Sequence, residues 1–197
     1  MKRSGFLNKW IKCLIVAAIA MLFAVPVHAG GRVYLEWQVY DMGNNQQSGN
    51  VKGYDSSGNQ IWYYQCGSYS RTELDSVTML GIRDDRFYLV ESGTVVALDC
   101  STGQIMWTNS DFRGCPSQNG FQVSSSGKVY LCGYYGPDLF IADRNGKTMS
   151  RVNSLAYNSY WPYNLRFTTG DNMKIDYESD NSTLEFNVVN YFGTIQY

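Results

Sequence analysis

An interval of 44 residues is the feature that most limits how this chain can fold. Asp55, Asp99 and Asp143 recur at that interval, and each follows a short apolar or aromatic run and precedes a turn that contains glycine. A second pattern consists of a glycine, strand-forming residues and an aromatic residue four positions after the glycine. It occurs after these three turns, at 58–62, 103–107 and 146–150, and once more at 193–197, with Ser150 in the aromatic place of the third copy. Such a period indicates one structural unit copied along the chain.

Each unit reads as four short antiparallel strands. The first strand of a unit is expected at 77–80, 121–123 and 165–168, and the second at 33–35, 87–90, 129–131 and 173–175. The third is expected at 95–98, 139–142 and 184–186. The fourth is the segment that begins with the repeated glycine, as at 58–62 and 103–107. Turn residues such as Asp84-Asp85 and Ser126-Gly127 separate the first strand from the second. Small twisted sheets bury both faces only by stacking, so we expect an all-β fold: a β-propeller-type repeat of about four four-stranded blades, the first incomplete, in a small ring or an open arc.

The second unit resembles a known repeat. Ala97, Asp99, Thr102, Gly103 and Trp107 match the Ala-x-Asp-x-x-Thr-Gly-x-x-x-Trp motif of the pyrroloquinoline-quinone-like β-propellers. The match is partial at 54–62 and faint in the third and fourth units. In such blades the aspartate and glycine shape a turn and the tryptophan packs between blades, so the resemblance implies structural roles for Asp55, Gly58, Trp62, Asp99, Gly103, Trp107, Asp143 and Gly146.

The resemblance points to a non-enzymatic member of that family. Its enzymes look like complete eight-bladed rings with a quinone and a metal on the axis, often beside two adjacent cysteines. This chain has four units and no adjacent cysteines. We therefore expect a binding platform with no cofactor and no metal.

The first 29 residues read as a signal peptide. Lys2, Arg3, Lys9 and Lys12 precede an apolar run over 14–27, and small residues stand at Val27 and Ala29, where a signal peptidase reads. An uncleaved anchor is the alternative, but the run is shorter than the roughly 20 residues that span a bilayer. We expect residues 1–29 to be removed, residues 30–197 to form one repeat domain, and the product to be secreted or periplasmic.

Removing this leader changes the available chemistry. The only histidine of the chain, His28, lies within it, so the remaining chain cannot use a Ser-His-Asp or Cys-His mechanism or a histidine-ligated zinc site. Four of the 16 basic side chains and none of the 17 acidic ones leave with the leader. The mildly acidic remainder is poorly suited to bind nucleic acid, which requires basic side chains for the phosphates.

Four cysteines remain after Cys13 leaves with the leader. An even number in an exported chain predicts two disulfides, and the spacing leaves all three pairings open. No C-x-x-C pair is present, which disfavours a redox or zinc motif. The four candidates are Cys66, Cys100, Cys115 and Cys132.

The candidate binding residues are aromatic. Tyr157, Tyr160, Trp161 and Tyr163 crowd the connection between the third and fourth units, where they could stack on sugar rings or anchor a protein. Packing between blades is the alternative role. Asp176 is interpreted as part of a solvated acidic strand face rather than a calcium site.

The sequence therefore favours an exported, non-catalytic β-propeller repeat protein that binds a protein or a surface glycan. The alternative is a carboxylate-dependent enzyme such as a glycosidase, which needs only two suitably spaced acids in a cleft. A further hypothesis is a homodimer that completes a ring, because an open arc would expose sheet edges and apolar faces.

Overall fold

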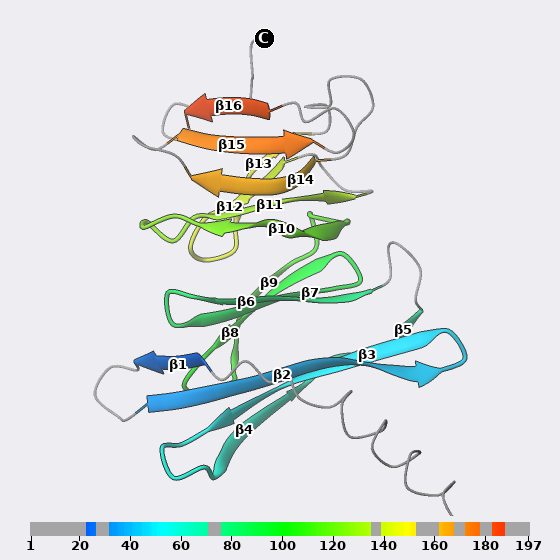
Figure 1. The fold of residues 1–197 in the computed structure, drawn as a ribbon, viewed down its shortest axis with the longest axis vertical. Coiled ribbons are helices and arrows are strands. Elements are labelled where there is room, and N and C mark those ends of the chain that lie inside the picture. The colour runs from blue at the N-terminus through cyan, green and yellow to red at the C-terminus, as the bar shows by residue number, and fades with distance from the viewer. Residues whose placement is uncertain are drawn as a thin grey trace, which may run out of the picture.

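The structure is a computed structural model and describes residues 23–26, 32–70, 76–134, 139–152, 162–167, 172–177 and 183–187. Every regular element within these ranges is a β-strand, which confirms the predicted all-β class. The strands form antiparallel hairpins that follow one another along the longest axis of the molecule (Figure 1). This is the propeller-type stacking of repeated sheets that the 44-residue interval predicts.

The first sheet has a strand that the sequence did not predict. Its main order is β1 (Phe23–Pro26), β2 (Arg32–Gly43), β3 (Gln46–Tyr54) and β4 (Gln60–Gln65), and β5 (Tyr69–Ser70) also pairs with β3. Asn44 and Asn45 join β2 to β3 with φ of 53° and 59°, which asparagine tolerates well. The first unit is therefore complete, but its first strand comes from the expected leader.

The second sheet has apolar side chains on both faces. It consists of β6 (Val77–Arg83), β7 (Arg86–Glu91), β8 (Thr94–Asp99) and β9 (Ile105–Asn109), in that order. The turn between β6 and β7 is the expected Asp84-Asp85 pair, and both residues have positive φ. Alternate residues of β7 enter different cores: Phe87 packs toward the first sheet and Tyr88 toward the third unit.

The third and fourth units share one curled sheet of seven strands. The third unit contributes β10 (Cys115–Val123), β11 (Val129–Tyr134), β12 (Leu139–Ala142) and β13 (Thr148–Val152), and the fourth contributes β14 (Pro162–Phe167), β15 (Asn172–Tyr177) and β16 (Thr183–Asn187). Separate blades were expected here. Instead β10 pairs with β14 in parallel at Asn119 and Asn164, and the Gln122 side chain donates to the Leu165 carbonyl at 2.9 Å.

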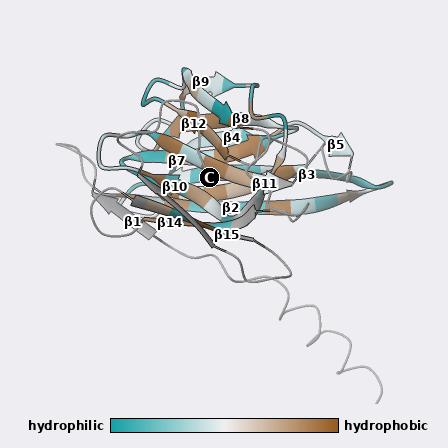
Figure 2. Ribbon diagram, turned by 90° about the horizontal axis from the view of Figure 1, so that it is seen from above, coloured by the Kyte–Doolittle hydropathy of each residue, from teal (hydrophilic) through white to brown (hydrophobic). Residues whose placement is uncertain are grey.

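Three hydrophobic cores hold the stack together. The first lies between the first and second sheets, the second between the second sheet and the third unit, and the third within the curl of the seven-stranded sheet. Seen along the stack, hydrophobic residues gather in the strands and hydrophilic ones in the turns (Figure 2). The second sheet thus buries both of its faces, whereas the first sheet buries the face that it turns toward the second.

The cysteine prediction differs from the structure. The structure forms no disulfide among Cys66, Cys100, Cys115 and Cys132, so the two expected bridges are not present. Cys66 and Cys100 are instead apolar members of the first core, with exposed fractions of 4% and 0%. A buried thiol behaves as a small hydrophobic side chain, which explains these positions without a bridge.

Candidate functional site

The repeated aspartates form the turns after the third strands. Asp55 Oδ1 accepts hydrogen bonds from the Ser57 and Asn59 backbone N–H groups at 2.9 and 2.8 Å, and Asp143 Oδ1 accepts two equivalent bonds at 2.8 and 2.9 Å. Asp99 Oδ1 accepts hydrogen bonds from the backbone N–H and the hydroxyl of both Ser101 and Thr102. These carboxylates therefore stabilise the turns by accepting hydrogen bonds from their backbone N–H groups.

The repeated tryptophans join neighbouring units. Trp62 Nε1 donates to the Cys100 carbonyl at 3.1 Å, and its ring covers Gly103. Trp107 Nε1 donates to the Arg144 carbonyl at 3.1 Å, and its ring covers Gly146. In both units, the tryptophan of one sheet closes onto the Asp-Gly turn of the next.

The aromatic residues proposed from the sequence are not gathered into a described site. Tyr157, Tyr160 and Trp161 lie outside the described residues. Tyr163 belongs to β14, but the structure describes only its backbone. Their role as binding residues stays a prediction.

The interpretation of Asp176 as a solvated acid is wrong. Its side chain is buried, with 9% of the residue exposed, and it accepts hydrogen bonds from Asn164 Nδ2 at 2.6 Å and Arg166 Nη2 at 2.9 Å. This carboxylate therefore links β15 to β14 through side-chain hydrogen bonds. Among the described residues, no group of three or more histidine, cysteine, aspartate or glutamate side chains could hold a metal ion.

A polar surface covers the side of the first sheet that faces away from the second sheet. We call it the outer face; its residues alternate along β2, β3 and β4 with the core residues Val33, Leu35, Val51 and Trp62. Tyrosine, amide and charged side chains dominate it. They are Tyr34, Glu36, Gln38, Tyr40, Ser48, Asn50, Lys52, Tyr54, Tyr63 and Gln65.

Hydrogen bonds order this outer face. Gln65 Nε2 donates to the Tyr40 hydroxyl at 2.8 Å and to Ser48 Oγ at 2.9 Å, and the Tyr63 hydroxyl donates to Gln65 Oε1. Asn50 is 5% exposed, and its Oδ1 has no hydrogen-bond partner within the described part of the chain. A buried acceptor of this kind normally receives a donor from water or a ligand.

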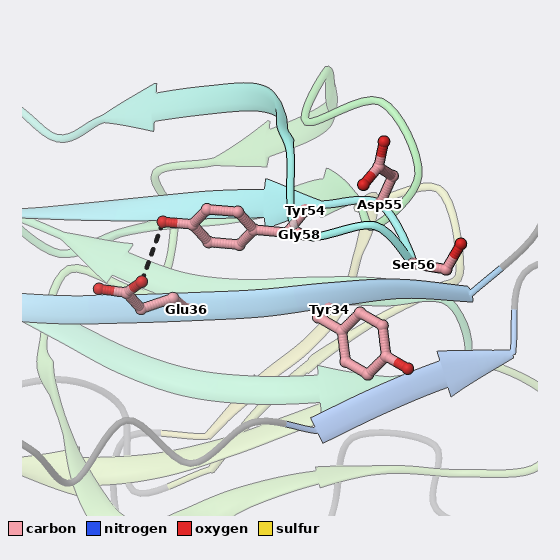
Figure 3. Close-up of a pocket in the computed structure, with 6 residues that line it drawn as sticks. All are labelled: Tyr34, Glu36, Tyr54, Asp55, Ser56 and Gly58. Atoms are coloured by element: carbon pink, nitrogen blue, oxygen red, sulfur yellow. Dashed lines mark hydrogen bonds between the residues drawn. The ribbon is translucent and has the colours of Figure 1, made fainter.

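A pocket of about 440 Å³ opens at one end of the outer face. Residues of β2, β3 and the turn after β3 line it (Figure 3): Tyr34, Glu36, Tyr54, Asp55, Ser56 and Gly58. The Tyr54 hydroxyl donates to Glu36 Oε2 at 2.9 Å, and Lys52 Nζ lies 3.7 Å from Glu36 Oε1. Burial and then the hydrogen bond to Glu36 raise the pKa of Tyr54, so its phenol stays protonated.

The lining suits recognition better than acid catalysis. Two phenol rings can stack on a sugar or a cationic group, and Glu36 and Ser56 can accept hydrogen bonds from it. A glycosidase would need an acid with a raised pKa beside a second carboxylate. The pKa of Asp55 is instead lowered, chiefly by the hydrogen bonds from Asn59.

The outer-face pocket was missed at the sequence level, although a signal for it exists. In 33–37, apolar and polar residues alternate, which places Tyr34 and Glu36 opposite the core face. The same alternation places Lys52 and Tyr54 on β3. Pairing the two strands in register would have brought these four residues together.

A second polar cluster lies between the first and second sheets. Glu91 is 7% exposed and accepts hydrogen bonds from the Tyr64 hydroxyl at 2.6 Å, the Tyr69 hydroxyl at 2.9 Å and the Gly67 N–H at 3.0 Å. Burial and then the bond to Glu91 raise the pKa of Tyr69 to about 12. We call this the Glu91 clamp; it ties β4 and the residues after it to β7.

Comparisons with known proteins show no family. No protein-family model and no curated protein matches the chain. Within the described residues, no helix is long and apolar enough to cross a membrane.

Two solved structures are similar in part. One is the computationally designed Ika8 protein, with a TM-score of 0.46 and 14% identity over 81% of this chain and 51% of that one. The other is KlHsv2 with loop 6CD replaced by a Gly-Ser linker, with a TM-score of 0.46 and 8% identity over 70% of this chain and 48% of that one. The chain spans about half the length of each.

Proposed function

We propose that this protein is an exported, non-catalytic binding platform whose ligand site is the pocket on the outer face of the first sheet. Export follows from the leader-like segment 1–29, whose removal would leave the domain 30–197 outside the cell or in the periplasm. The ligand is a polar group, either a sugar of a surface glycan or a basic side chain of a partner protein.

The observation that carries this proposal is the pairing of Tyr34 and Tyr54 with Glu36 in one open pocket. Aromatic rings supply contact area at small entropic cost, and a carboxylate fixes the orientation of the ligand. The Tyr54–Glu36 hydrogen bond holds both side chains in place before a ligand arrives. Preorganisation of this kind reduces the free energy lost on binding.

Screening the exported chain against a glycan array and a peptide array tests this function. Tyr54→Ala is expected to weaken binding to the ligand found by about tenfold or more, the cost of one aromatic contact. The matched control is Tyr63→Ala, because Tyr63 lies on the same outer face, is 49% exposed and does not line the pocket. Equal losses from both variants, or none from Tyr54→Ala, would remove the pocket as the ligand site.

The same screen examines the glycosidase alternative. If the protein cleaves a glycan that it binds, reducing ends appear over time. Loss of that product in Glu36→Gln, with binding retained, would favour an enzyme over a platform. We expect binding without product.

A further inference from the structure

Leader residues occupy the end place of the first sheet. β1 pairs antiparallel with the start of β2, with Phe23 opposite Leu35 and Val25 opposite Val33. Among the described strands, β1 is the only neighbour of β2 on that side. All of β1 belongs to the segment 1–29, which the proposed export removes.

In the second and third units a longer strand fills the corresponding place. β6 has seven residues and β10 has nine, and each supplies a core side chain that is 5% exposed, Val77 and Phe121 respectively. In the first unit, β1 has four residues, beside core residues Val33 and Leu35 that are 6% and 0% exposed. Without β1, an unpaired backbone edge would lie beside this core, and such an edge pairs readily with another strand.

The sequence of β2 is self-complementary about Tyr34. When two copies of β2 run antiparallel with Tyr34 opposite Tyr34, Val33 falls opposite Leu35 and Arg32 falls opposite Glu36, each pair occurring twice. Directly opposed residues share a face of an antiparallel sheet. The apolar pairs therefore continue the core face, and each Arg32–Glu36 pair brings residues of opposite charge into register.

We propose that leader removal frees the edge of β2 and that a second copy of the chain fills it, forming a dimer through an antiparallel β2–β2 pair about Tyr34. The incoming Val33 and Leu35 take the register places that Phe23 and Val25 hold beside β2. This inference rests on the proposed export, because β1 blocks the edge until the leader leaves. It also places the pockets of the two copies side by side, with both Tyr34 residues at the joint.

Pairing at this edge suits a second copy better than packing between sheet faces. The stacked faces of the molecule are apolar, whereas the outer face of the first sheet carries the polar side chains of Gln38 and Lys52. A ring closed through that face would bury these polar groups at a cost. The β2 edge instead offers apolar and oppositely charged partners from the chain itself.

Sedimentation equilibrium of the processed chain over a concentration series tests the dimer. The short strand pair predicts a dissociation constant on the order of micromolar. Glu36→Arg sets Arg32 opposite a like charge and is expected to weaken the dimer at least tenfold, because opposed like charges destabilise a strand pair. The double variant Arg32→Glu/Glu36→Arg restores opposite charges and is expected to restore the dimer to within about threefold.

Cross-linking tests the register independently of charge. Tyr34→Cys places two cysteines opposite each other at the joint and is expected to form an intermolecular disulfide under mild oxidation. The matched control is Gln38→Cys, because it lies on the same face of the same strand but far from its copy in the partner. Equal cross-linking of both variants would overturn the proposed register.

The remaining outcomes separate this inference from the proposed export. The mass of the purified chain reports leader removal by itself. A chain with Ala29→Tyr resists the peptidase and keeps β1, so Tyr34→Cys in that background is expected to give no cross-link. A processed chain that stays monomeric, or a dimer equally stable in wild type and Glu36→Arg, would overturn the inference; so would a β2 edge found paired with a peptide or with another segment of the chain.

Discussion

At the residue scale, Trp107 shows how a single side chain joins two units. It is 9% exposed, donates to a carbonyl of the next turn and meets Tyr88 at a ring-centroid distance of 5.9 Å. Trp107→Ala is expected to lower the free energy of unfolding by about 3–5 kcal/mol, because it leaves a cavity between the sheets. Urea denaturation followed by circular dichroism measures this.

Met106 is the matched control for that substitution. It precedes Trp107 on β9, and it is 46% exposed. Met106→Ala is expected to change the free energy of unfolding by less than about 0.5 kcal/mol. Similar losses from both substitutions would mean that β9 itself, and not the tryptophan contact, holds the units together.

At the scale of a structural element, two glycine turns separate backbone strain from packing. Gly58 and Gly103 both have positive φ, at 83° and 69°. A Cβ at Gly58 would meet nothing within 4 Å, whereas a Cβ at Gly103 would lie 2.5 Å from the Trp62 ring. Gly58→Ala is expected to lower the free energy of unfolding by about 1–2 kcal/mol, from backbone strain alone. Gly103→Ala is expected to lower it by about 1–3 kcal/mol more than Gly58→Ala, because the added methyl group also clashes with the Trp62 ring.

The measurement is again urea denaturation, now with both glycine variants compared in a Trp62→Ala background. If the added cost at Gly103 comes from the ring, removing the ring should bring the two glycine substitutions to similar costs. An added cost that persists without Trp62 would contradict this account of the turn.

The Glu91 clamp predicts how the joint between the first two sheets responds to alkaline pH. The pKa of Tyr69 is raised to about 12 in the folded protein from an ordinary value of 10.0, and the pKa of Tyr64 is raised as well. Because the unfolded chain loses these protons first, the clamp contributes its full stability below pH 10 and loses it as pH rises toward 12. The free energy of unfolding should fall across that window.

Tyr69→Phe tests this pH dependence. The variant is expected to be less stable at neutral pH, since it loses a hydrogen bond to a buried carboxylate, and to show a shallower decline between pH 10 and 12. The control is Tyr63→Phe, because Tyr63 lies on β4 but is 49% exposed on the outer face. An unchanged slope in Tyr69→Phe would show that other groups cause the alkaline loss.

At the scale of the whole molecule, local sequence signals predicted the described strands and turns of the second to fourth units, but not β1, β3 and β5 of the first unit or how the units join. Asp84-Asp85 and the Asp-Gly turns act within a few residues, so the sequence reveals them. The β10–β14 pairing uses backbone groups, which leave no side-chain pattern. Asp176 looked solvated because its partner Arg166 stands ten positions earlier and meets it only through the hairpin register.

The candidate site could not be predicted either, because it also depends on contacts between separate strands. Tyr34 and Glu36 on β2 and Tyr54 on β3 form the pocket only after the two strands pair across a long hairpin. Neither strand alone carries a binding motif. The sequence analysis therefore placed the binding residues at 157–163, where aromatic residues are denser. Binding surfaces assembled from separate strands need the register as well as the pattern.

The two core thiols report whether the whole stack unfolds as one unit. Burial raises the pKa of Cys100 to about 12, and burial followed by the charge of Glu91 raises that of Cys66, so neither forms thiolate near neutral pH. We expect both to resist iodoacetamide in the folded protein and to react in urea. Alkylation measured by mass spectrometry should follow the same transition as circular dichroism, because the first core opens only when the sheets separate. Alkylation at a lower urea concentration would show that the contact between the first two sheets opens before the rest of the molecule. If the cysteines react only after a reductant is added, the disulfides expected from the sequence are present.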